Sequence, residues 1–148
     1  IAASIRKYMK RGKLDEKGME DVTNYWIKEI GIKAPSPKPA VRTLSGGNAQ
    51  KVVIAKWLNT NPKLFILDGP TVGVDVGAKA EIHAILHDLA RKGISIIIIS
   101  DDLPELVQNC NKILVMRDGK MSGMMDNSID ERSLGNMLIG ADKGGDKA

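Results

Sequence analysis

The chain has 148 residues, 43% of them hydrophobic and 27% charged, a balance that excludes a disordered or collagen-like protein and is typical of one globular domain. Its formal charge of +4 comes from residues 1–13, which hold five basic residues and no acidic one, so the charge favours a solvated helix face over a nucleic-acid site. The longest apolar run, Ile94 to Ile99, is too short to span a bilayer, and the single cysteine, Cys110, excludes an internal disulfide.

The first part of the chain is predicted to be helical. Apolar residues recur at helical spacing over residues 1–13, which predicts a first helix there. A second helix is predicted over residues 15–30, because Asp15 can cap its first turn and Gly31 can end it. The three prolines within residues 33–39 predict an extended linker.

The remainder alternates between helices and short apolar strands. Helices are predicted at 48–58, 77–91, 104–109 and 132–139, and strands at 64–67, 94–99, 112–116 and, as an antiparallel return, 121–125. Strands that are apolar throughout are typical of a parallel sheet with both faces buried. The predicted fold class is therefore α/β, a mostly parallel sheet with helices on both faces, preceded by an α-helical subdomain. The expected division is 1–61 for the helical subdomain, 62–126 for the core, and 127–148 for a terminal helix and a frayed tail.

A pair of glycines stands directly before the third predicted helix, in Leu44-Ser45-Gly46-Gly47-Asn48-Ala49-Gln50-Lys51. Because glycines have no side chains, their backbone N–H groups are open to a ligand, Ser45 adds a hydroxyl, and the start of a helix is electropositive. These features suit an anion such as phosphate, although a serine and two glycines are also an ordinary helix start.

Two carboxylates follow this segment. Asp68 ends the apolar strand at 64–67, and a carboxylate at the carboxyl end of a buried strand faces the ligand crevice of an open sheet, where it can hold the Mg²⁺ of a nucleotide through water. Asp75 lies in Gly73-Val74-Asp75-Val76-Gly77-Ala78-Lys79, at the entry to the next helix. Taken singly, each is also an ordinary turn or cap residue.

In this order, the three features resemble the ATP-binding-cassette (ABC) ATPase family, over about residues 5–140. Leu44 to Gln50 resembles the family's signature sequence, Leu64 to Asp68 its Walker B strand, and Pro70-Thr71 with Val74-Asp75 its D-loop. The forms at 44–51 and 73–79, followed by Leu103-Pro104-Glu105, are similar to the second cassette of ribose- and galactose-type sugar importers. The resemblance implies a partial P-loop NTPase fold in an ATP-hydrolysing transport subunit.

The resemblance also implies that the complete assembly binds ATP and Mg²⁺ between two cassettes that meet head to tail. The signature of one cassette would contact the ATP held by the phosphate loop of the other, through Leu44, Ser45, Gly46, Gly47, Asn48 and Gln50. Asp68 would hold Mg²⁺ through water, and Asp75 would lie at the interface between the cassettes.

Three departures from the family pattern bear on activity. No G-x-x-x-x-G-K-[ST] phosphate loop is present and the first residue is Ile1, so we expect a piece that lacks the front half of its cassette and is inactive when isolated. Gly69 stands where the family has its catalytic glutamate, and Asp101 stands where it has its switch histidine. A glycine offers no base and an aspartate repels the γ-phosphate, so the chain's own site is predicted to be degenerate.

The partners that the resemblance implies are a second cassette, in the same polypeptide or as a dimer mate, integral membrane permease subunits and, indirectly, a periplasmic or extracellular sugar-binding protein. The chain is expected to be soluble, to lie at the cytoplasmic face of the membrane, and to bind no nucleic acid. Two alternatives stay open: a regulatory or structural cassette half without hydrolysis, and a non-transport cassette protein that works on DNA or the ribosome. The sugar-type form of residues 44–51 argues against the second.

The remaining chemistry-bearing residues are assigned to structure. His83 and His87 stand four apart on one predicted helix, a spacing that suits zinc, but no third ligand is evident and two solvated histidines are favoured. The methionines and tryptophans are predicted to pack, under the hairpin for Met121, Met124 and Met125, and in the core for Trp26 and Trp57.

Overall fold

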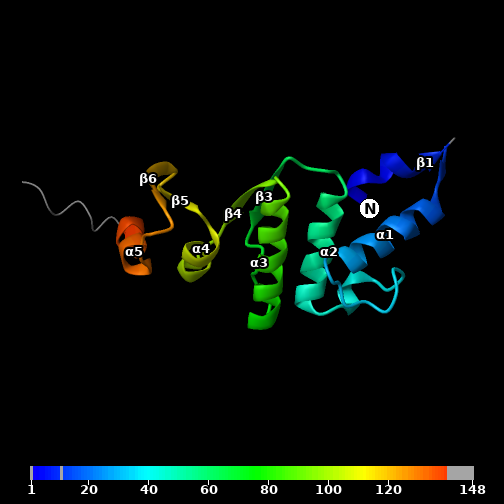
Figure 1. The fold of residues 1–148 in the computed structure, drawn as a ribbon, viewed down its shortest axis with the longest axis horizontal. Coiled ribbons are helices and arrows are strands. Elements are labelled where there is room, and N and C mark those ends of the chain that lie inside the picture. Colours follow the sequence, from blue (N-terminus) through cyan, green and yellow to red (C-terminus); the bar gives the residue numbers. More distant parts are fainter. Residues whose placement is uncertain (1, 11, 140–148) are drawn as a thin grey trace, which may run out of the picture. The chain divides into compact units, whose positions relative to one another are not determined.

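The computed structural model describes residues 2–10 and 12–139, which divide into two compact units (Figure 1). The first unit comprises Ile1–Ile66 and Pro70–Ile97, and the second comprises Leu67–Gly69 and Ile98–Ala148. The frayed tail predicted at residues 143–148 lies outside the described residues. None of the helices in the described part of the chain combines the length and the hydropathy that a bilayer crossing requires.

The elements follow one another as the alternating pattern predicts, and the fold class is α/β. Those that lie in the first unit are the 3-10 helices η1 (Ala2–Tyr8) and η2 (Val41–Thr43), the strands β1 (Met9–Lys10) and β2 (Lys13–Leu14), and the helices α1 (Glu16–Glu29), α2 (Gly46–Leu58) and α3 (Val76–Arg91). Strands β3 (Leu64–Asp68) and β4 (Ser95–Ile99) begin in the first unit and end in the second. The second unit continues with α4 (Leu103–Asn109), β5 (Lys112–Arg117), β6 (Lys120–Asp126) and α5 (Glu131–Ile139).

The helix predicted over residues 1–13 is confirmed only in part, because the described residues of this segment are helical at Ala2–Tyr8 alone. This segment forms η1, which is kinked at Ser4, followed by a hairpin in which Met9 of β1 pairs with Leu14 of β2. The cause is tertiary, because Asn59 at the end of α2 donates a hydrogen bond to the Ser4 hydroxyl and its carbonyl accepts one from Lys7. These hydrogen bonds stabilise the kinked conformation of residues 2–8, which the helical spacing of apolar residues does not predict.

Helices α1 and α2 agree with the helices predicted at residues 15–30 and 48–58. Asp15 caps α1 by accepting a hydrogen bond from the Gly18 N–H at 3.0 Å, and α1 ends before Gly31. The buried residues Ile30, Ile32 and Ala55 form the core between the end of α1 and α2. The partly buried side chains that pack against this core include Trp26, Ile27, Leu44, Val52 and Ile85. Trp57, in contrast, is 47% exposed, so its predicted place in the core is wrong.

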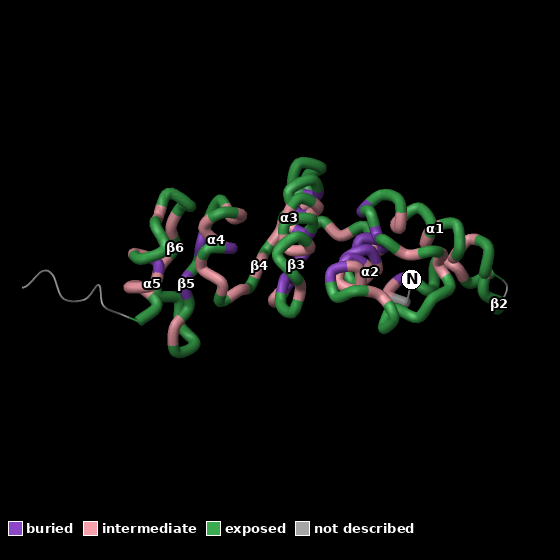
Figure 2. Tube along the Cα trace, turned by 90° about the horizontal axis from the view of Figure 1, so that it is seen from below, coloured by how far each residue is buried: buried purple, intermediate pink, exposed green. Residues whose placement is uncertain are grey.

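The described strands form three two-stranded sheets rather than one continuous sheet. Strands β3 and β4 are parallel, as predicted, because the Ser95 N–H donates to the Lys63 carbonyl beside their starts and the Gly69 N–H donates to the Ile99 carbonyl beside their ends. The prediction that both strands are wholly buried is wrong. Burial alternates along β3, and the exposed large apolar residues of this sheet are Leu64, Ile66, Ile97 and Ile99. In Figure 2 the trace of β4 has the colours of exposed and intermediate residues. Among the described residues, none packs on one face of this sheet closely enough to bury these apolar side chains.

Strands β5 and β6 form the predicted antiparallel hairpin. Asp118 and Gly119 both have positive φ, which is what the tight type I′ turn between two strands requires. One face of the hairpin packs on α5, where the buried residues are Ile113, Val115 and Leu134. Met125 packs on this cluster as predicted. The same prediction is wrong for Met121 and Met124, which are 69% and 65% exposed on the other face.

Candidate functional site

The segment at 44–51 forms the start of α2, and Ser45 is its N-cap residue. The Ser45 carbonyl accepts the first helical hydrogen bond, from the Ala49 N–H at 2.8 Å, but its side chain does not cap the helix. The first N–H groups of any helix have no acceptor within the helix. Because Ser45 supplies none and is exposed, the positive end of α2 is open to an anion from outside.

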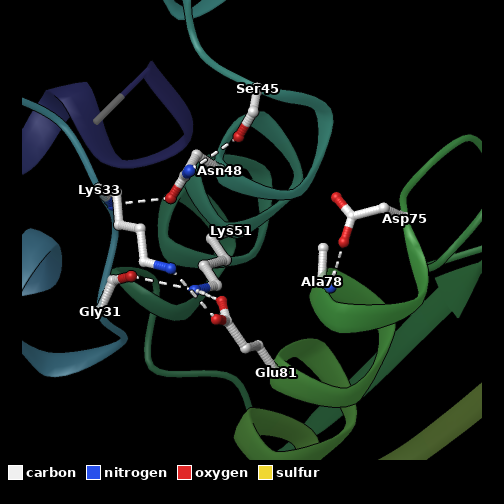
Figure 3. A network of polar contacts seen from close by, with 8 residues as sticks. All are labelled: Gly31, Lys33, Ser45, Asn48, Lys51, Asp75, Ala78 and Glu81. Carbon is white, nitrogen blue, oxygen red and sulfur yellow. Dashed lines mark hydrogen bonds and ion pairs between the residues drawn. The ribbon is translucent and has the colours of Figure 1, made fainter.

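Asn48 connects Ser45 to the start of the linker (Figure 3). Its Oδ1 accepts a hydrogen bond from the backbone N–H of Lys33 at 2.7 Å, and its Nδ2 donates to the Ser45 Oγ at 2.8 Å. Sequence reasoning places Asn48 among the ligand-contacting residues. In the structure both polar ends of the Asn48 side chain are hydrogen-bonded within the chain, and one of the partners is the exposed Ser45.

The two glycines differ in their surroundings. Gly46 is exposed, and a Cβ built on it would lie 3.2 Å from the Gly73 carbonyl oxygen. Gly47 is buried, and a Cβ built on it would lie only 2.4 Å from the Cβ of Ala78 in α3. Gly46 therefore belongs to the open helix start, whereas Gly47 permits the close approach of α2 and α3.

The start of α3 lies beside the start of α2. Asp75 caps α3 by accepting a hydrogen bond from the Ala78 N–H at 2.9 Å, and its side chain stays exposed (Figure 3). The contacts between the helices pair Gly46 with Gly73, Gly47 with Ala78 and Lys51 with Glu81. Because the residue numbers rise together, the two helices run in the same direction from neighbouring N-termini.

A buried lysine ties the two helices together one turn further on. Lys51 is 3% exposed, and its Nζ donates to Glu81 Oε2 at 2.5 Å and to the Gly31 carbonyl at 3.0 Å. Lys33 contacts the other carboxylate oxygen of Glu81 at 3.4 Å. The hydrogen bond from Lys51, with its charge, lowers the pKa of Glu81 below its ordinary value. The sequence analysis assigns no role to Lys51 and Glu81. A signal was available, because Lys51 lies one turn after Gly47 on a helix face that is otherwise apolar, with Ile54, Ala55 and Leu58.

Three further predicted site residues lie in the second unit. Asp68 ends β3 with an exposed side chain, and Asp101 is exposed shortly after the end of β4. Gly69 has a φ of +55°, in the left-handed region, and its N–H donates to the Ile99 carbonyl at 2.9 Å. Ser100 is held by the buried carboxylate of Glu105 and accepts a hydrogen bond from the Asp102 N–H. The loop that carries Asp101 is therefore anchored by Glu105, to which the sequence analysis gives no role in the site.

The last two predicted contact residues are both partly buried. Leu44 packs against the core cluster of Ile30, Ile32 and Ala55, and Gln50 is half-buried in α2. Within residues 2–10 and 12–139, no three His, Cys, Asp or Glu side chains are grouped as a metal site would need.

The chain is similar to known proteins in sequence and in fold. Residues 5–72 match the ABC transporter family. The chain is 45% identical over 118 residues to a ribose import ATP-binding protein, RbsA, of Shouchella clausii, an alignment that covers 79% of the chain and 24% of that protein. It is 42% identical over 134 residues to the galactose/methyl galactoside import ATP-binding protein MglA of Escherichia coli, covering 90% of the chain and 26% of that protein.

Among solved structures, cbiO1 of Clostridium perfringens, part of the ABC transporter complex cbiONQ, is similar to the chain with a TM-score of 0.66 and 28% identity. The match covers 87% of the chain and 50% of cbiO1. The chain thus has the fold of ABC ATPase cassettes, and it spans about a quarter of the length of the curated relatives it matches.

Proposed function

Residues 5–72 place the chain in the ABC transporter family, and on this premise we propose that it supplies the signature surface of an ATP-binding subunit that drives sugar import. In this proposal Ser45 and the first N–H groups of α2 bind the γ-phosphate of an ATP molecule that a second cassette holds. The relatives that import ribose and galactose support a simple sugar as the transported solute.

The observation that carries the proposal is the open N-terminus of α2. Ser45 precedes the helix without capping it through its side chain, and Ser45 and Gly46 are both exposed. A terminal phosphate offers only acceptor oxygens and negative charge, and it is therefore complementary to this end of the helix. Asp75 at the neighbouring helix start already caps α3, which leaves α2 as the helix that needs an acceptor.

The chain's own Walker B region supports an impaired second site. Asp68 is an exposed carboxylate at the end of a strand, a donor of the kind that Mg²⁺ takes together with phosphate oxygens, so this residue fits the ion. When bound with ATP, Mg²⁺ would neutralise phosphate charge there. Gly69 next to it offers no side chain to orient a water, and Asp101 offers a negative charge in place of a neutral donor.

We propose that the subunit works at the cytoplasmic face of the membrane, with a second cassette and membrane permease subunits. The similarity to cbiO1, which is part of a transporter complex, supports an assembly of this kind. A binding protein outside the membrane would deliver the solute.

Replacing Ser45 with alanine tests the proposal. In the complete ATP-binding protein assembled with its membrane subunits, Ser45→Ala is expected to lower ATP turnover about 100-fold, because a preorganised donor to the developing phosphate charge is lost. The matched control is Ser122→Ala, which removes an exposed hydroxyl from β6 and should leave turnover unchanged. Wild-type turnover in the Ser45 variant would contradict the proposal.

Placing a glutamate at Gly69 tests whether the backbone at this position accepts a side chain. Gly69→Glu is expected to cost about 1–2 kcal/mol of stability, because a side chain at a φ of +55° is strained, and to leave turnover no higher than in the wild type. Gly69→Asn, whose side chain tolerates the left-handed region better, should cost less stability. Thermal unfolding and steady-state ATP hydrolysis measure the two effects. A rise in turnover with the glutamate would show that the backbone relaxes and would contradict this expectation.

A further inference from the structure

A directed chain of hydrogen bonds ends at the Ser45 hydroxyl. The Lys33 backbone N–H donates to Asn48 Oδ1 at 2.7 Å, and Asn48 Nδ2 donates to Ser45 Oγ at 2.8 Å (Figure 3). The chain begins at a backbone N–H, which can only donate, so the carbonyl oxygen of Asn48 must face Lys33. The NH₂ group of Asn48 must therefore face Ser45.

This direction determines what the serine hydroxyl can do. A hydroxyl has one proton to donate, and its oxygen can accept. Because the Ser45 Oγ accepts from Asn48, its proton is not needed inside the chain and is left to donate outward. A terminal phosphate accepts and does not donate when it is fully ionised, so a serine held in this state is preorganised for it.

We propose that Asn48 is a positioning residue that holds the Ser45 hydroxyl as a donor toward the terminal phosphate, and that it does not itself bind ATP. The proposal rests on the function proposed for Ser45. The Asn48 carbonyl oxygen and one of its two amide hydrogens are already used within the chain. Asn48 therefore acts on turnover only through Ser45.

A double-mutant cycle in the complete transporter tests this dependence. Asn48→Ala is expected to lower the single-turnover rate of ATP hydrolysis about tenfold when Ser45 is present, which corresponds to one hydrogen bond that is no longer preorganised. In the Ser45→Ala background, the same Asn48→Ala change is expected to have less than about a twofold effect, because the hydroxyl it positions is gone. Asn48→Asp, which has the same shape but cannot donate, should cost at least as much as alanine when Ser45 is present.

The matched control is Lys38→Met, which removes an exposed lysine side chain from the same linker without touching the hydrogen-bond chain, and it should leave the rate within about twofold of the wild type. Thermal unfolding identifies any variant that fails to fold, and the isosteric Asn48→Asp then takes the place of Asn48→Ala in the cycle.

The outcomes separate this inference from the function it rests on. An equal loss from the Asn48 change with and without Ser45, or no loss in either background, would overturn the positioning role. A full rate in Ser45→Ala alone would instead overturn the proposed function. A tenfold loss that disappears without Ser45 supports both.

Discussion

Replacing Gly47 with valine is expected to destabilise the protein by about 2–3 kcal/mol and to reduce ATP turnover below detection. A Cβ at this position would lie 2.4 Å from the Ala78 Cβ, which is closer than two carbon atoms can pack, so α2 and α3 must move apart. That movement would separate the start of α2, with Ser45, from the start of α3, with Asp75. Thermal unfolding and ATP hydrolysis of the complete protein measure the two losses.

Changing the neighbour of Gly47 gives the control. Gly47→Ala should be destabilising on its own, and adding Ala78→Gly should recover most of that loss, because the second change removes the methyl group that the first one meets. Gly135→Ala is the matched substitution elsewhere, since Gly135 lies inside α5 and a Cβ there would meet Leu103 at an ordinary 3.8 Å. It should be neutral or stabilising by up to about 1 kcal/mol. Equal effects at positions 47 and 135 would contradict the close-packing argument.

Replacing Glu81 with glutamine is expected to lower the thermal midpoint of unfolding by several degrees at neutral pH. The change leaves the Lys51 ammonium, 3% exposed, without the negative charge that it contacts at 2.5 Å. Lys51→Met in the same protein should recover part of the loss, because an uncharged side chain of similar length needs no partner. Glu29→Gln at the exposed Glu29–Lys92 pair is the control and should change the midpoint little. If Glu81→Gln and Glu29→Gln have the same small effect, the buried lysine is not held by this pair.

The same pair predicts a pH dependence with a definite sign. Lys51 lowers the folded-state pKa of Glu81 below its ordinary 4.5, so the stabilisation is fully present above about pH 4.5 and is lost as the pH falls through the lowered pKa. The wild type should therefore lose its advantage over Glu81→Gln on acidification below about pH 4.5. Unfolding midpoints of both proteins between pH 3 and pH 7 would show it, and a difference that stays constant with pH would count against the assignment.

The helices of this protein follow from local chemistry and could be predicted from the sequence. Asp15 and Asp75 begin α1 and α3 because their carboxylates accept hydrogen bonds from the N–H three residues on, an interaction that needs no distant residue. The hairpin turn at Asp118 and Gly119 is local for the same reason. The family could also be recognised, because the order of the 44–51, 64–68 and 73–79 segments is visible without a structure.

The errors lie where distant residues decide. Residues 2–8 form a kinked 3-10 helix held by hydrogen bonds with Asn59 at the end of α2, and the helix does not continue to residue 13 as predicted. The sequence predicts that β3 and β4 are buried on both faces, but apolar side chains on one face are exposed. Apolar composition indicates that a strand tends to be buried, but it does not identify the residues that pack on each face. Trp57 is apolar at helical spacing but lies on the side of α2 that no described residue covers fully.

The sequence by itself determined the family, the helix starts, and the residue types at the start of α2. Only the tertiary structure decided what each of those residues does, since Gly47 turned out to face Ala78, Asn48 to hold Ser45, and Lys51 to meet Glu81 thirty residues away. The physical reason is that a motif specifies which groups are available, whereas a close contact or a hydrogen bond also needs the position of its partner, and that position is set by how α2 packs on α3.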